Sequence, residues 1–143
     1  MTQPIGGEDR ERAHIRVSIT RNPPSLSDVV SFLRSCCREC GALTIYVGIV
    51  KPFSSSGSRV VGMEIECSSS ALKELESGVA KVLEDTGCKA IYVWHREGFA
   101  KPGEELSIIG AIGLTRHEVV EAVRRCIEVV KSCKSIVRKE VTE

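Results

Sequence analysis

The amino-acid sequence predicts a single α+β domain with three main helices and a mixed or antiparallel sheet. A chain of 143 residues with 42% hydrophobic residues can bury one substantial core, but it is short for two. Segments with strand periodicity come in pairs between segments with helical periodicity. Such pairs are typical of hairpins, and they favour an α+β layout over the strict alternation of a doubly wound sheet.

The N-terminal part of the chain predicts a tail, a strand and a helix. Residues 1–13 are polar and lack the apolar core of a signal peptide, so we expect a disordered tail, in a cytoplasmic protein, before a domain at residues 14–143. Apolar and polar residues alternate over residues 14–20, as in a half-buried strand. Two prolines end it, and Ser25 then begins a capping-box pattern for a helix that we expect to end at Gly41.

The middle of the chain predicts two strands and a second helix. Residues 42–50 are almost continuously apolar and rich in β-branched residues, which favours a central strand covered on both faces. The serine-rich segment 53–58 predicts a mobile loop, and residues 59–67 alternate as a strand. Apolar residues then recur at helical spacing over about residues 70–85, and Gly87 ends that helix.

The last third predicts three strands and a third helix. Residues 88–95 and 106–113 have strand character, and residues 96–104 between them contain a Pro-Gly turn and predict a loop. A Thr–Glu capping box predicts a helix from residue 115 to residue 131 or 132. A short strand at residues 135–141 ends the domain.

The charge balance excludes two classes of partner. Lys and Arg number 20 against 19 Asp and Glu, a net charge of +1, so no overall field favours nucleic acid or a membrane surface. No apolar run approaches the roughly 20 residues that a membrane span requires. Any basic site must therefore be local.

The seven cysteines predict mostly free, buried thiols, since cysteine packs as a small hydrophobe and the odd count forbids complete pairing. Cys36-Cys37-x-x-Cys40 is a possible zinc pattern, but no second close Cys/His pair follows it, so we expect no metal. Cys126 and Cys133 lie seven residues apart, about 10 Å along a helix, so they cannot bridge each other there.

Cations recur near the ends of the predicted elements. Arg116 lies in the first turn of the helix that Thr115 caps. Either Arg116 and the free backbone N–H groups of this turn bind an anion, or Arg116 is an exposed side chain beside an ordinary helix cap. His95 at a strand end is either an acid or base, or it fixes a turn. Near the end of the same helix, cations crowd together: Lys131, Lys134, Arg138 and Lys139. Either their mutual repulsion lowers the pKa of one lysine, which can then transfer a proton, or they simply stabilise the negative end of the helix dipole.

Several segments, in this order and spacing, resemble the family of large, catalytic subunits of molybdopterin synthase. They are the strand Gly41–Lys51, His95-Arg96-x-Gly98 with Pro102-Gly103-Glu104, Arg116 with Glu121-Ala122, and Lys131 with the closing Arg138-Lys139-Glu140. The resemblance implies a hammerhead-like α+β fold and a homodimer of large subunits within a heterotetramer. It also implies a small ubiquitin-like sulfur-carrier subunit as partner.

The resemblance further implies a sulfurtransferase. The partner's thiocarboxylated Gly-Gly tail would donate sulfur to cyclic pyranopterin monophosphate and form the dithiolene of molybdopterin, without a metal or another cofactor. By position, Lys131, as the proton-transfer group, and Arg138 would be the catalytic residues. The residues implied in substrate binding are Ile49, Val50, Lys51, Thr115, Arg116, Lys139 and Glu140.

Some positions depart from the family pattern. Lys51 replaces an arginine, Thr115 a histidine, Arg138 a lysine and Val137 a tryptophan. Either Lys139 takes over from the missing lysine by a register shift, or the chain has diverged in activity. The alternative function is a non-catalytic scaffold that binds a ubiquitin-like Gly-Gly tail. A thiol- or metal-based redox module is a third hypothesis.

Overall fold

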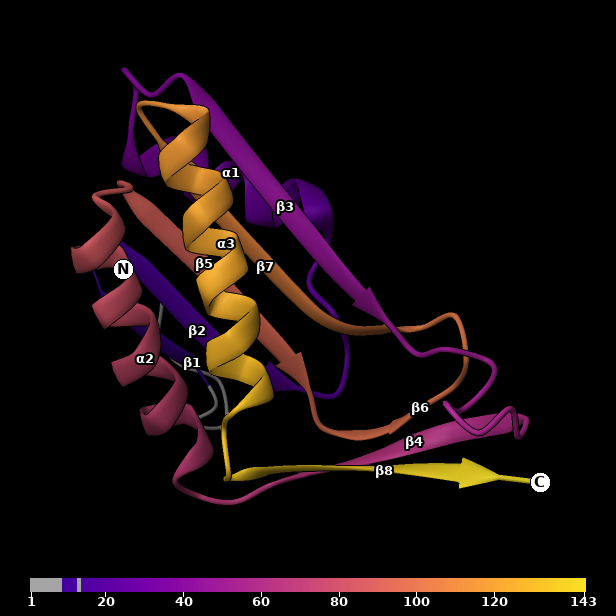
Figure 1. Ribbon diagram of the computed structural model, residues 1–143. Helices are drawn as coiled ribbons and strands as arrows, with labels where there is room; N and C mark the ends of the chain where they lie inside the picture. Colours follow the sequence, from indigo (N-terminus) through magenta and orange to yellow (C-terminus); the bar gives the residue numbers. More distant parts are fainter. Residues whose placement is uncertain (1–8, 13) are drawn as a thin grey trace.

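The computed structural model describes residues 9–12 and 14–143, which form two sheets and three helices (Figure 1). The large sheet has the strand order β1-β2-β5-β7-β3, and the small sheet has the order β6-β4-β8. The elements are β1 (Asp9–Arg12), β2 (Ile15–Thr20), α1 (Leu26–Cys36), β3 (Ala42–Ile49), β4 (Val60–Cys67), α2 (Ala71–Thr86), β5 (Ala90–Arg96), β6 (Gly98–Ala100), β7 (Glu105–Gly113), α3 (Arg116–Lys131) and β8 (Ile136–Thr142). The predicted α+β class is confirmed.

The large sheet is mixed and is covered on both faces. Strand β2 runs parallel to β5, and the other neighbours pair antiparallel. Helices α2 and α3 pack on one face and α1 packs on the other (Figure 1). Every residue of β5 is buried as a result, because a central strand between two helical layers has no solvent face.

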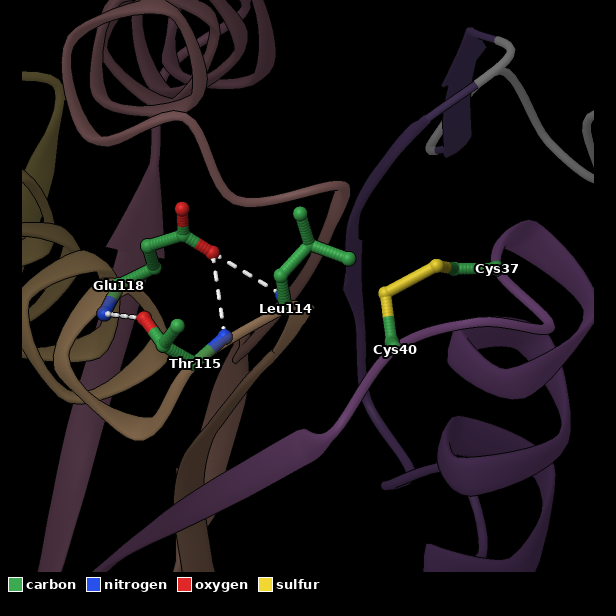
Figure 2. Close-up of a disulfide and its surroundings, with 5 residues drawn as sticks. All are labelled: Cys37, Cys40, Leu114, Thr115 and Glu118. Atoms are coloured by element: carbon green, nitrogen blue, oxygen red, sulfur yellow. Dashed lines mark hydrogen bonds between the residues drawn. A yellow bond between two sulfur atoms is a disulfide. The ribbon is translucent and has the colours of Figure 1, made fainter.

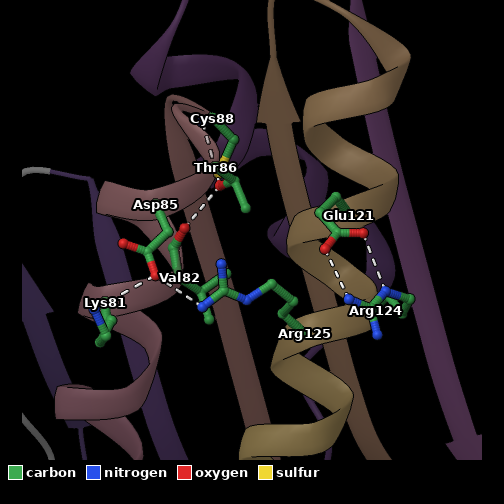
Figure 3. A network of polar contacts seen from close by, with 8 residues as sticks. All are labelled: Lys81, Val82, Asp85, Thr86, Cys88, Glu121, Arg124 and Arg125. Atoms are coloured by element: carbon green, nitrogen blue, oxygen red, sulfur yellow. Dashed lines mark hydrogen bonds and ion pairs between the residues drawn. The ribbon is translucent and has the colours of Figure 1, made fainter.

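An ion pair at the surface links helices α2 and α3, in addition to their apolar packing. An oxygen of Asp85 on α2 accepts a hydrogen bond from Arg125 on α3 at 2.9 Å and lies 3.5 Å from the Lys81 ammonium (Figure 3). Beside it, Arg124 and Glu121 form a two-bond pair within α3. These pairs lie at the surface, where solvent screening weakens them, so each contributes little to the stability of the fold.

The small sheet extends from one end of the large sheet. Strand β5 leads into β6 across a single residue, and Gly98, with φ of 94°, takes the backbone through a conformation that favours glycine. On the other side, residues 132–135 connect α3 to β8, which pairs along β4. The two sheets therefore diverge where β5 and α3 end.

Three expectations about strands need correction. Strand β3 lies at the edge of the large sheet, not at its centre, because only β7 pairs with it. Its residues are accordingly mostly half-buried. Residues 9–12 form β1 on β2, so a disordered tail is wrong for them, and the rest of 1–13 lies outside the described residues. Part of the predicted 96–104 loop forms β6.

Helix α1 ends earlier than expected, at Cys36 instead of Gly41. Cys37 has extended backbone angles and forms a disulfide with Cys40, so the chain leaves the helix there (Figure 2). Gly41 then donates a backbone hydrogen bond to Gly113 and enters β3. No helix in the described ranges is both long and apolar enough to cross a bilayer.

Candidate active site

A cavity of about 500 Å³ lies where the two sheets diverge, between the end of α3, strands β3 and β7, and strand β8. Three cationic side chains line it, and they come from different parts of the chain: Lys51, Lys131 and Arg138. Its other lining residues are Tyr46, Gly48, Ile49, His95, Leu106, Ser107, Ile109, Ile127 and Val130. No carboxylate is among these residues, so the cavity suits an anion.

Each cation is placed by the end of an element. Lys131 is the last residue of α3, and Lys51 follows the end of β3. After α3 the chain turns across the end of the helix (Figure 1), and Arg138 on β8 lies beside that end, where its Nη2 donates to the Val130 carbonyl at 3.0 Å. Lys131 and Arg138 therefore line the same cavity.

His95 contacts Arg138 at the floor of this cavity. The imidazole is fully buried on β5, and its Nε2 lies 3.2 Å from Arg138 Nε and 3.1 Å from Arg138 Nη2. A guanidinium can only donate, so Nε2 accepts and the ring proton resides on Nδ1, which donates to the Arg96 carbonyl at 2.8 Å. Both nitrogens of His95 are therefore occupied.

The electrostatics of this pair follow from burial. Desolvation, aided by the charge of Arg138, lowers the pKa of His95 to about 4, so the imidazole is neutral at pH 7. Burial also lowers the pKa of Arg138 from its ordinary value, although a guanidinium stays charged in proteins. The structure thus shows His95 as a neutral ring with both nitrogens hydrogen-bonded.

Thr115 and Arg116 do not reach this cavity. They lie at the N-terminal end of α3, and Lys131 lies fifteen residues further along, which places it about 22 Å away. The predicted capping box is present: Thr115 Oγ1 accepts from the Glu118 N–H at 3.4 Å, and Glu118 accepts from the backbone N–H groups of Thr115 and Leu114 (Figure 2).

Lys139 and Glu140 also lie outside the lining of the cavity. Successive side chains of β8 alternate between faces, so Lys139 lies on the face opposite Arg138, and both it and Glu140 are exposed. Replacing Arg138 by Lys139 would require a one-residue slip against β4, which would turn the buried Ile136 outward. The register-shift alternative is therefore wrong for this chain.

A shallower groove continues from the cavity along the end of β3. Its volume is about 420 Å³, and it shares Ile49 and Lys51 with the cavity. Val50, which is almost fully buried, lines it together with residues from two loops: Pro52, Pro102 and Gly103. The groove is mostly apolar and lies beside the cations.

The cysteines contribute no group to the cavity. Cys37 and Cys40 are joined, and the other five form no disulfide, which agrees with the expectation of mostly reduced thiols. Burial raises the pKa of Cys126 to about 12, so that thiol is inert. Within residues 9–12 and 14–143, no group of three or more His, Cys, Asp or Glu side chains is arranged to hold a metal ion.

Comparison with known proteins identifies the family. The family described as MoaE protein matches residues 19–133, most of the chain. The chain belongs to the MoaE protein family. The chain is 30% identical, over 109 residues, to the molybdopterin synthase catalytic subunit of Taeniopygia guttata, a match that covers 73% of this chain and 68% of that protein. A protein of the same name from Drosophila mojavensis is 29% identical over 108 residues, which cover 74% of this chain and 29% of that protein.

Solved structures share this MoaE fold. Molybdopterin synthase from Staphylococcus aureus superposes with a TM-score of 0.81 at 20% identity, over 94% of both chains. A complex of subunits 1 and 2 of molybdopterin-converting factor from Helicobacter pylori gives a TM-score of 0.69 at 19% identity, over 89% of this chain and 85% of that one. At these identities the likeness establishes the fold.

Four of the nine residues that the resemblance predicted as functional line the cavity: Ile49, Lys51, Lys131 and Arg138. Val50 lines the adjoining groove. His95 carries two possible roles in the sequence, and its contact with Arg138 appears only in the structure. A side-chain contact between two residues 43 positions apart leaves no local signal in the sequence.

Proposed function

We propose that this MoaE-family chain is the catalytic subunit of a molybdopterin synthase. It would transfer sulfur from the thiocarboxylated C-terminus of a small ubiquitin-like subunit to cyclic pyranopterin monophosphate. The observation that carries the proposal is the carboxylate-free cavity lined by Lys51, Lys131 and Arg138. The phosphate and the thiocarboxylate are both anions, and charge-assisted hydrogen bonds from these groups would hold them.

Lys131 is our proposed proton-transfer group. Sulfur donation breaks the carbon–sulfur bond of the thiocarboxylate, which becomes a carboxylate with oxygen from water, and it forms a carbon–sulfur bond on the pterin, which loses an oxygen as water. Protons must move at these atoms, and a nearby amine can accept or deliver them. Arg138 keeps its proton in proteins, and both ring nitrogens of His95 are already in hydrogen bonds. Lys131, at the end of α3, has an exposed side chain that reaches the cavity.

The adjoining groove is our proposed path for the partner's tail. An extended Gly-Gly segment is thin enough for a groove of this kind, and Ile49 and Lys51 belong to both the groove and the cavity. The H. pylori relative of this fold was solved as a complex of two subunits of molybdopterin-converting factor, which supports a small-subunit partner here.

A homodimer within a heterotetramer is the assembly that we propose. Thr115 and Arg116 lie about 22 Å along α3 from Lys131, so they cannot serve the same site within one chain. A second copy could bring its own Thr115 and Arg116 to this cavity. That arrangement reconciles the residues predicted from the resemblance with the distance along the helix. The cytoplasmic location stays a prediction.

The decisive experiment combines the purified chain with a thiocarboxylated small subunit and cyclic pyranopterin monophosphate. We expect molybdopterin to form, and we expect Lys131→Ala to abolish most of the yield. Lys134→Ala is the matched control, because Lys134 is exposed nearby but does not line the cavity. An unchanged yield with Lys131→Ala would show that the assignment of Lys131 is wrong.

A non-catalytic scaffold is the second candidate function, and the departures at Lys51, Thr115 and Arg138 favour it. It predicts that the chain binds the small subunit but makes no product. A pull-down of the small subunit, run beside the activity assay, separates the two functions.

A further inference from the structure

We propose that His95 is a positioning residue, which holds the Arg138 guanidinium in one orientation so that Arg138 can bind an anion in the cavity. The catalytic part of this proposal rests on the proposed function. His95 itself acts through Arg138 and need not touch the substrate.

The geometry of the guanidinium supports this role. Nε and Nη2 of Arg138 both donate to His95 Nε2, at 3.2 and 3.1 Å, and Nη2 also donates to the Val130 carbonyl at 3.0 Å. Because the guanidinium is planar, fixing these two nitrogens fixes the whole group. Within the described part of the chain, no acceptor contacts Nη1, so its two N–H groups remain for a ligand in the cavity that Arg138 lines.

His95 is itself held rigidly. Its ring is fully buried on the central strand, and Nδ1 is bonded to the Arg96 carbonyl. The Arg96 side chain is fixed in turn, because it donates to the carbonyls of Arg21 and Glu105 at 2.7 and 2.6 Å. The acceptor for Arg138 therefore lies on an element that cannot easily rearrange.

The contact with His95 accounts for an arginine at position 138, where the family pattern has lysine. An ammonium is a compact point charge that needs little orientation, whereas a guanidinium binds an anion well only when its edge is aimed at it. Lys51 and Lys131 supply further positive charge to the cavity. His95 supplies the acceptor that orients Arg138.

Steady-state kinetics on a double-mutant cycle test the proposal in the complete synthase. His95→Leu should raise the KM for one of the two anionic substrates about ten- to a hundredfold, the range for a lost hydrogen bond to a charged group, with a smaller change in kcat. In His95→Gln, whose amide oxygen can accept from Arg138, the KM should return most of the way to that of the natural chain. In an Arg138→Lys background, His95→Leu should add less than about a threefold effect, since the partner is gone. An equal loss in both backgrounds would show a merely structural role.

Nitrogen NMR of the chain alone gives a result that does not depend on activity. We expect His95 to be the Nδ1–H tautomer at pH 7, with an Nε2 resonance that shifts in Arg138→Lys. An Nε2–H tautomer or an imidazolium would overturn the positioning proposal even if the enzyme is active. Conversely, a synthase without product but with the expected tautomer would refute the proposed function and leave the His95–Arg138 contact established.

Discussion

Mild acid should destabilise the folded chain through His95. The imidazole is fully buried beside a guanidinium, which lowers its pKa from 6.5 to about 4. In the unfolded chain the pKa of His95 returns to about 6.5, so between these two values the unfolded state binds a proton that the folded state does not. Stability therefore rises with pH across this window, and it is lost as the pH falls from 6.5 towards 4.

The size of the effect follows from the same two values. At about 1.36 kcal/mol per pKa unit, a change from 6.5 to about 4 corresponds to about 3 kcal/mol in full. Integrating the linkage relation, about 2 kcal/mol of this is lost between pH 7 and pH 5. Hydrogen bonds also lower the pKa values of Glu74, Asp85 and Glu121, so acid weakens the fold through these carboxylates as well, and a comparison of the natural chain with a His95 variant removes that shared contribution.

Urea unfolding at pH 7 and at pH 5, followed by circular dichroism, measures this difference. The free energy of unfolding should fall by about 2 kcal/mol in the natural chain. His95→Gln, which cannot take up a proton, should lose most of this pH dependence. His14→Gln removes an exposed histidine instead and should leave it intact. Equal pH dependence in the natural chain and in His95→Gln would refute the reasoning.

Three further predictions concern stability, each read from urea midpoints. Thr115→Ala should cost about 1 kcal/mol through loss of the capping box with Glu118, whereas Thr115→Ser should cost little, and equal losses would contradict this. Gly110→Ala should destabilise by about 1 to 3 kcal/mol, because its Cβ would lie 2.8 Å from a methyl of the fully buried Leu33, and an unchanged midpoint would count against it. Cys37→Ser should cost at most about 2 kcal/mol, since the disulfide closes a very short loop, and a larger loss would indicate a role beyond loop closure.

Local patterns predicted the elements of this fold well. The six expected strands and three helices are present close to their expected positions, because periodicity and caps act within a few residues. The place of β3 was not predictable in the same way. An apolar, β-branched strand can lie at the centre or the edge of a sheet, and only its long-range pairing with β7 decides.

The candidate site was predictable in part, and for a physical reason. Lys131 and Arg138 are seven residues apart across one turn, so their closeness is nearly a local property. The separation of Arg116 from Lys131 could have been read from the length of the helix between them, about 22 Å. The contact of His95 with Arg138 joins β5 to β8, which belong to different sheets, so it appears only in the folded chain.

The position of the cavity follows from how the chain passes between its two sheets. It does so at three points near the cavity: just after β3, where Lys51 lies, at the end of β5, where His95 lies, and at the end of α3, where Lys131 lies. At these points the backbone is fixed by the hydrogen bonds of the large sheet or of α3, and the cavity lies where the small sheet diverges from the large one. The backbones of Lys51 and Lys131 are therefore held in place while their exposed side chains line the cavity. This combination of a rigid frame and an accessible charge is what binding an anion in a defined orientation requires.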